Sequence, residues 1–160
     1  MGQHPNNPHG GPRGKLFWGL MAAYAATHSL HFAINAELIP FYPYMPQWVR
    51  PGTVYAAWLA VNALGLLGVV LHGLGHRRWA CAALALYGLL GLDGLLHYAL
   101  DLCVEHGTLT NIAIAATALT GLAFTGASVW AYANKSGALR PRITRVRVYS
   151  LRPAPPSPRP

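Results

Sequence analysis

Four apolar runs, each about 20 residues long, constrain this chain more than any other feature of its sequence. They extend over residues 16–39, 53–74, 79–103 and 109–133. Because a helix rises about 1.5 Å per residue, each run can cross a hydrocarbon core of about 30 Å. Only 10% of the residues are charged and the mean hydropathy is +0.29, which disfavours a soluble helical bundle with polar outer faces. The sequence therefore predicts an all-α membrane protein, with a four-transmembrane-helix antiparallel bundle over residues 15–134.

The distribution of positive charge predicts the orientation of this bundle. Basic residues precede the first run, lie between the second and third, and follow the fourth; they are Arg13, Lys15, Arg77, Arg78, Lys135, Arg140, Arg142, Arg145, Arg147, Arg152 and Arg159. Only Arg50 falls on the other side. The positive-inside rule then predicts an integral membrane protein, such as one of a bacterial inner membrane, with both termini in the cytoplasm. No aromatic interleaving or reading module accompanies the net charge of +8, so we expect no nucleic-acid partner.

The segments outside the bundle have compositions typical of disorder. Residues 1–14 are rich in Gly, Pro, Asn and His, and predict a disordered cytoplasmic leader. Residues 135–160 predict a basic, Pro-rich cytoplasmic tail that contacts anionic lipid. The connection over residues 40–51 contains four prolines and is expected at the outer interface.

Polar side chains form a stripe on two of the predicted helices. Asp93, His97 and Asp101 are four residues apart, so a regular helix places them on one face. Tyr24, His28, His31 and Asn35 form a similar stripe on the first run. His28 and His31 should lie roughly 18 and 22 Å above the inner boundary, and Asp93 and His97 roughly 21 and 27 Å above it. An ionisable side chain in a membrane helix costs about 3 kcal/mol or more, so two stripes at one depth indicate a functional site.

The residue types in these stripes favour a transition-metal site that faces the periplasm. Neutral imidazole and carboxylate suit copper, zinc or iron, and a cation offsets carboxylates that would repel one another in lipid. We expect the inner ligands to be His28, His31, Asp93 and His97. An outer shell or second site would comprise Asp101, Glu105, His106 and Glu37. The predicted protein is a metal-binding oxidative-enzyme subunit or a metal-handling accessory.

One short motif favours copper over the other metals. Asp93-x-x-x-His97 followed by His106 resembles the Asp-x-x-x-His…His copper motif in the membrane C subunit of particulate methane and ammonia monooxygenases. The resemblance covers about 14 residues, and its second interval is shorter than in that family. It implies copper as the metal and Asp93, His97 and His106 as its ligands.

Other functions use the same residues. A metal-free membrane enzyme would use Asp93 and His97 as acid and base on a lipid-like substrate. A haem-binding electron carrier would pair His28 or His31 with His97, and a proton pathway would use the stripe as stepping stones. Hydrogen bonds between these histidines and aspartates could also join two helices without any ligand. Whether the chain is an enzyme stays open at this point.

Two further features have simpler interpretations. His72 and His76 are most simply an interfacial pair near the inner end of the second run. The fourth run carries a face of small residues, comprising Thr110, Thr117, Gly121, Thr125 and Ser128. Such a face packs helices closely, and a structural subunit would use it to contact other membrane subunits.

Overall fold

The computed structural model describes residues 12–41, 45–99 and 107–133. These residues form α1 (Pro12–Leu38), the 3-10 turn η1 (Ile39–Phe41), α2 (Pro51–Gly73), α3 (Arg77–Leu89), the 3-10 segment η2 (Leu90–Leu95), α4 (Leu96–Ala99) and α5 (Thr108–Ala133). No strand occurs among them, so the described part of the chain is all-helical, as the sequence predicts. Arg50 precedes α2 in extended backbone and Pro51 occupies its first turn, where a missing amide hydrogen costs nothing.

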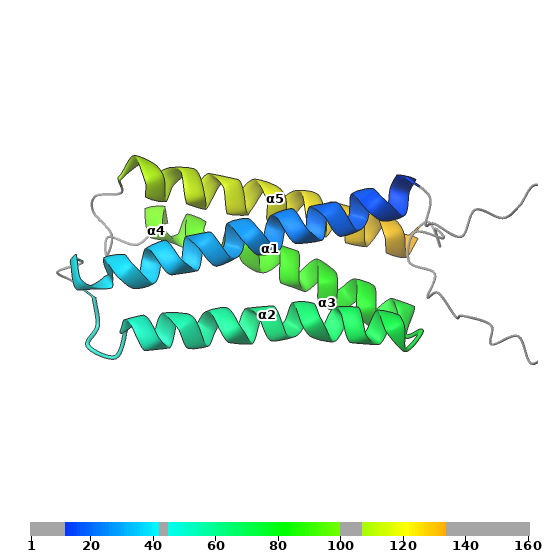
Figure 1. The fold of residues 1–160 in the computed structure, drawn as a ribbon, viewed down its shortest axis with the longest axis horizontal. Coiled ribbons are helices and arrows are strands. Elements are labelled where there is room, and N and C mark those ends of the chain that lie inside the picture. The colour runs from blue at the N-terminus through cyan, green and yellow to red at the C-terminus, as the bar shows by residue number, and fades with distance from the viewer. Residues whose placement is uncertain (1–11, 42–44, 100–106, 134–160) are drawn as a thin grey trace, which may run out of the picture.

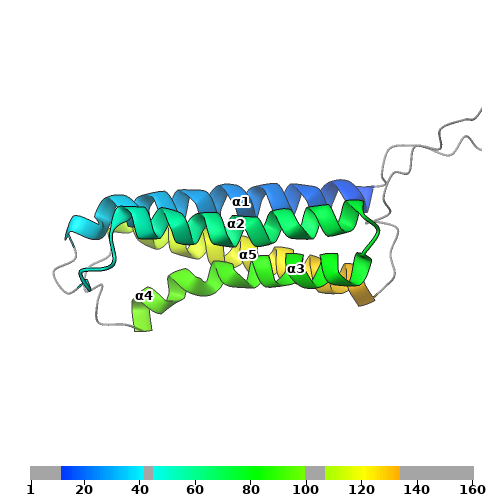
Figure 2. The same ribbon diagram turned by 90° about the horizontal axis from the view of Figure 1, so that it is seen from below.

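The long helices lie side by side in antiparallel order (Figures 1 and 2). Helix α1 contacts α2 and α5, and α3 contacts the same two helices from the opposite side. Both described ends of the bundle, at Pro12 and Ala133, lie at the same end as the turn between α2 and α3 (Figure 1). The η1 turn and the start of α5 lie at the other end.

Three stretches are long and apolar enough to cross a membrane: Pro51–Gly73, Arg77–Ala99 and Thr108–Ala133. Large apolar side chains cover the outside of these stretches, among them Leu59, Leu66 and Leu119, each at least 60% exposed. A soluble protein rarely exposes apolar surface on this scale, so the exterior fits a lipid environment. Helix α1 is not among the three stretches, because its interior face carries histidines and an asparagine.

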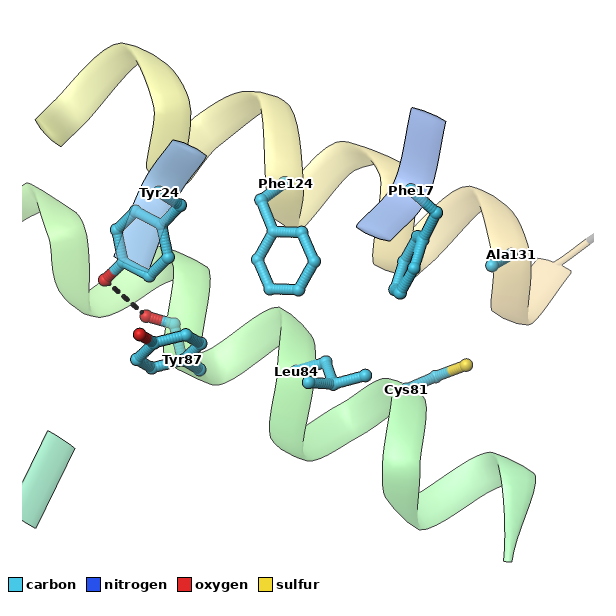
Figure 3. Close-up of a cluster of buried hydrophobic side chains, with 7 residues drawn as sticks. All are labelled: Phe17, Tyr24, Cys81, Leu84, Tyr87, Phe124 and Ala131. Atoms are coloured by element: carbon cyan, nitrogen blue, oxygen red, sulfur yellow. Dashed lines mark hydrogen bonds between the residues drawn. The ribbon is translucent and has the colours of Figure 1, made fainter. Parts of the chain in front are cut away.

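An aromatic core joins α1, α3 and α5 (Figure 3). Tyr24, Tyr87 and Phe124 are at most 2% exposed, and the Tyr24 and Tyr87 rings meet edge to face with centroids 4.7 Å apart. The Tyr24 hydroxyl donates a hydrogen bond to the Tyr87 backbone oxygen at 2.7 Å, and the Tyr87 hydroxyl donates to Asn62 Oδ1 at 3.0 Å. Both phenols thus satisfy their polar ends inside the bundle, and the second bond also ties α2 to α3.

The third apolar run differs from the single regular helix expected over residues 79–103. It is α-helical to Leu89, 3-10 from Leu90 to Leu95, and α-helical again in α4 up to Ala99, the last residue described in this run. Glycines recur every three residues at Gly88, Gly91 and Gly94, which matches one turn of a 3-10 helix. A Cβ on Gly91 would lie 2.6 Å from Tyr24 Cε2, and one on Gly88 would lie 2.8 Å from the Gly121 oxygen. The glycines therefore let η2 approach α1 and α5 closely.

The 3-10 segment also changes the predicted polar stripe. A 3-10 helix turns about 120° per residue, whereas an α-helix turns about 100°. Asp93 and His97 are thus separated by roughly 90° around the helix axis, not by the 40° of a regular α-helix. The expectation that Asp93 and His97 share one narrow face is wrong for this reason. Asp101, the third member of the stripe, lies outside the described residues.

The small-residue face of α5 is used inside the bundle. Thr117 and Ser128 are fully buried, and the Thr117 hydroxyl donates to the Thr27 backbone oxygen of α1 at 3.0 Å. Gly121 packs directly against Gly88 of α3. We expected this face to pack helices closely, and α1 and α3 lie against it; contact with other subunits through it was the alternative. The exposed face of α5 carries larger apolar residues, including Leu119 and Trp130.

Candidate functional site

An asparagine joins two histidines between α1 and α4. His31 and Asn35 lie one turn apart on α1, and His97 lies on α4. The Asn35 Nδ2 atom is 3.1 Å from His31 Nε2 and 3.1 Å from His97 Nε2. The two imidazole rings have centroids 5.8 Å apart and are nearly perpendicular. The structure therefore brings together one predicted ligand from the first apolar run and one from the third.

The hydrogen bonds fix the chemistry of this pair. An amide nitrogen only donates hydrogen bonds, so both Nε2 atoms accept, and each neutral ring carries its hydrogen on Nδ1. Two imidazole lone pairs therefore point at one position, which the Asn35 amide nitrogen occupies. A metal cation binds imidazole through these same lone pairs.

Three buried polar atoms on the same stripe of α1 lack partners. They are His28 Nε2, His31 Nδ1 and Asn35 Oδ1, none of which has a hydrogen-bond partner among the described residues. His28 and His31 are 0% and 1% exposed, so bulk water does not replace the missing partners. An unsatisfied buried polar atom costs about 1–3 kcal/mol, and native proteins keep few of them. Three of the five such atoms among the described residues lie on this stripe, so unsatisfied polar groups are concentrated here.

His28 faces a different part of the interior from the His31–Asn35–His97 group. Its ring packs against Phe32 at 4.7 Å and against Tyr24 at 5.2 Å between centroids. The Tyr24 oxygen is 3.5 Å from His28 Nδ1, and it already donates its hydrogen to Tyr87. His28 is thus held by aromatic contacts beside the site, with its Nε2 atom free to accept.

Asp93 borders the site through the residue that follows it. Its half-buried carboxylate accepts a hydrogen bond from the Gly94 amide at 2.7 Å. Gly94 in turn packs on the His31 ring, since a Cβ there would lie 3.1 Å from both Cε1 and Nε2. The other predicted carboxylate on α1, Glu37, is exposed. Asp101, Glu105 and His106 lie outside the described residues.

The described residues do not assemble a complete metal-ligand group. Among residues 12–41, 45–99 and 107–133, no three His, Cys, Asp or Glu side chains come together as such a group. The structure offers two imidazoles and an asparagine side chain, whereas the sequence predicts three histidines and an aspartate.

His72 and His76 do not form one site. The His72 ring packs against Trp18 of α1 at 5.7 Å, whereas His76 is exposed at the start of α3. The turn between them contains Gly75 with φ +80°, so the two residues do not share a helix. They therefore act separately.

No family model, curated protein or solved structure matches this chain.

Proposed function

We propose that this chain is an integral membrane protein that holds a transition-metal ion, with copper favoured, between His31 and His97 in the outer half of a four-helix transmembrane bundle. The observation that carries the proposal is the convergence of two imidazole Nε2 atoms on one amide nitrogen. The unpartnered His28 Nε2 and Asn35 Oδ1 atoms support it, because each has a lone pair that can bind a cation or accept from its water ligands.

The proposed orientation places both termini in the cytoplasm. Lys15 and Glu37 are 22 residues apart on α1, which corresponds to about 33 Å of helix and matches the bilayer core. The exposed α1 residues between them are apolar, namely Leu16, Gly19, Ala22, Ala23, Ala26 and Leu30. Helix α1 would therefore be the fourth spanning segment. Its start lies at the same end as the α2–α3 turn, which carries Arg77 and Arg78.

The ligand set favours copper over zinc. Two neutral imidazoles and the Asn35 oxygen make a set of few, uncharged donors, whereas a structural zinc site normally has four. To bind an ion, the Asn35 side chain would have to turn its oxygen toward the position that its nitrogen now occupies. Asp93, Asp101, Glu105 and His106 remain the predicted source of negative charge and outer ligands. A cuprous ion tolerates such a low coordination number.

The burial of the group favours metal handling over oxidation of an organic substrate. Asn35 and His97 are half-buried, whereas His31 is fully buried. An ion that arrives from the outer face would meet Asn35 and His97 first and His31 second. This increase in burial from Asn35 and His97 to His31 suits the uptake and transfer of a small ion, which needs no substrate cavity. We therefore assign the chain to the metal-handling accessories.

Elemental analysis of detergent-purified protein tests the proposal. Wild type from copper-supplemented cells should retain about one copper per chain, and His31→Ala and His97→Ala should lower its affinity by more than about 100-fold, the upper range for loss of an outer-shell partner. His76→Ala is the matched control, because it removes an exposed imidazole outside the site.

Two results would refute the proposal. One is a folded wild type that holds no copper, zinc or iron after supplementation. The other is retention by His31→Ala and His97→Ala at the level of His76→Ala. Circular dichroism of each variant keeps loss of metal distinct from loss of fold.

A further inference from the structure

An apolar groove runs between α2 and α3, near the turn that joins them. It has a volume of about 440 Å³ and is lined by Leu67, Leu71, Trp79, Ala82, Ala83 and Leu86. Trp79 is 71% exposed, and Leu67 and Leu86 are nearly half exposed, so the groove opens outward. In a bilayer, this opening faces the lipid chains.

The groove results from small residues between larger ones. Ala82 and Ala83 line the groove on α3, between Trp79 and Leu86 about one turn away on either side. Gly68 draws the two helices together, because a Cβ there would lie 2.6 Å from Leu84 Cγ. The groove therefore lies where α2 and α3 pack closely against each other.

An arginine and a histidine lie at the end of this groove, and the arginine is always positively charged. Arg78 is exposed and directly precedes Trp79, and His76 is exposed at the start of α3. Arg77 donates a hydrogen bond to the Ala131 backbone oxygen of α5, which anchors the start of α3. The sequence has no acidic residue between Glu37 and Asp93, so no carboxylate of α2 or α3 before Asp93 offsets this charge.

We propose that this groove binds one anionic phospholipid, with an acyl chain between α2 and α3 and its phosphate at Arg78 and His76. Apolar walls and a cationic mouth match the two parts of such a lipid, and a juxtamembrane Arg contributes about 1 kcal/mol toward anionic lipid. The proposal rests on embedding in the bilayer and is independent of the metal site.

Native mass spectrometry of the full chain, released from nanodiscs, tests this site. Nanodiscs of phosphatidylglycerol and of phosphatidylcholine with identical acyl chains serve as probes. Wild type should retain one phosphatidylglycerol and release phosphatidylcholine. Arg78→Gln should lower retention about fivefold, the equivalent of one surface charge.

Variants that fill the groove test the contribution of the apolar lining separately from that of the Arg78 charge. Ala82→Phe adds a ring to the α3 lining of the groove and should abolish retention, whereas Ala57→Phe on the exposed face of α2 should not. Arg50→Gln is the control for charge, because Arg50 lies at the opposite end of α2.

Equal retention of the two lipids by wild type would overturn the proposal. So would retention by Ala82→Phe at the level of Ala57→Phe, or by Arg78→Gln at the level of Arg50→Gln. Copper content should be the same in all five proteins, so the two proposals fail independently.

Discussion

At the scale of single residues, Asn35 decides the chemistry of the interior. Its spacing of four from His31 places it on the histidine stripe, and this is visible in the sequence. Its contact with His97 cannot be read from the sequence, because that contact depends on how η2 positions α4 against α1. The predicted ligand set left Asn35 out for this reason. Amides are weak metal ligands. Asn35 belongs to the candidate site only because two imidazoles converge on its side chain.

Replacing Asn35 tests how the metal-free bundle satisfies its histidines. Asn35→Ala removes the amide donor that His31 Nε2 and His97 Nε2 share, so the metal-free protein should lose about 1–3 kcal/mol of unfolding free energy. Chemical denaturation in detergent measures this loss. Added copper should restore part of it, because the ion binds the lone pairs that the amide no longer covers. A loss within about 0.5 kcal/mol, as for a surface change, would show that the bridge contributes nothing.

At the scale of elements, the existence and length of the helices could be predicted from apolar runs, but the break in the third could not. Apolar periodicity does not distinguish an α-helix from a 3-10 segment inside a continuous apolar run. The glycines at Gly88, Gly91 and Gly94 are the sequence feature that marks the break. They can be interpreted only once the helices that contact them are known. Tyr24 and Gly121 fill the space that side chains at Gly91 and Gly88 would need.

The contact between Gly88 and Gly121 offers a direct test of this packing. A Cβ on Gly121 would lie 2.5 Å from the Gly88 backbone oxygen, which cannot move without displacing α3. Gly121→Ala should therefore lower the unfolding free energy by about 3 kcal/mol. Gly126→Ala is the control on the same helix, because nothing lies within 4 Å of its added Cβ. It should be neutral or stabilising by up to about 1 kcal/mol. Equal stability of the two variants would contradict the close approach of α3 and α5.

At the scale of the whole molecule, composition alone predicts an all-helical chain with apolar helices suited to a bilayer. Three of the four expected spans meet that description in the structure, whereas α1 carries the buried polar stripe. The same histidines that lower the hydropathy of α1 are those that the sequence selects as functional. The proposed metal group could be predicted only in part: the predicted ligands His31 and His97 meet at Asn35, whereas Glu37 is exposed.

The proposed orientation is open to a labelling experiment. In a background with both cysteines replaced by serine, Gln47→Cys lies between α1 and α2, and His76→Cys lies at the α2–α3 turn. A membrane-impermeant maleimide added to intact cells should label Gln47→Cys and leave His76→Cys unlabelled until the membrane is opened. Labelling of both from outside, or of His76→Cys alone, would contradict cytoplasmic termini.

The central claim is that His31 and His97 share one metal ion. X-ray absorption of the copper-loaded protein measures the ligands of that ion directly. We expect two imidazole nitrogens at about 2.0 Å, a typical metal–imidazole distance. One imidazole should be lost in His31→Ala and one in His97→Ala, with no change in His76→Ala. A copper spectrum without imidazole scattering, or one that both site variants leave unchanged, would contradict the claim.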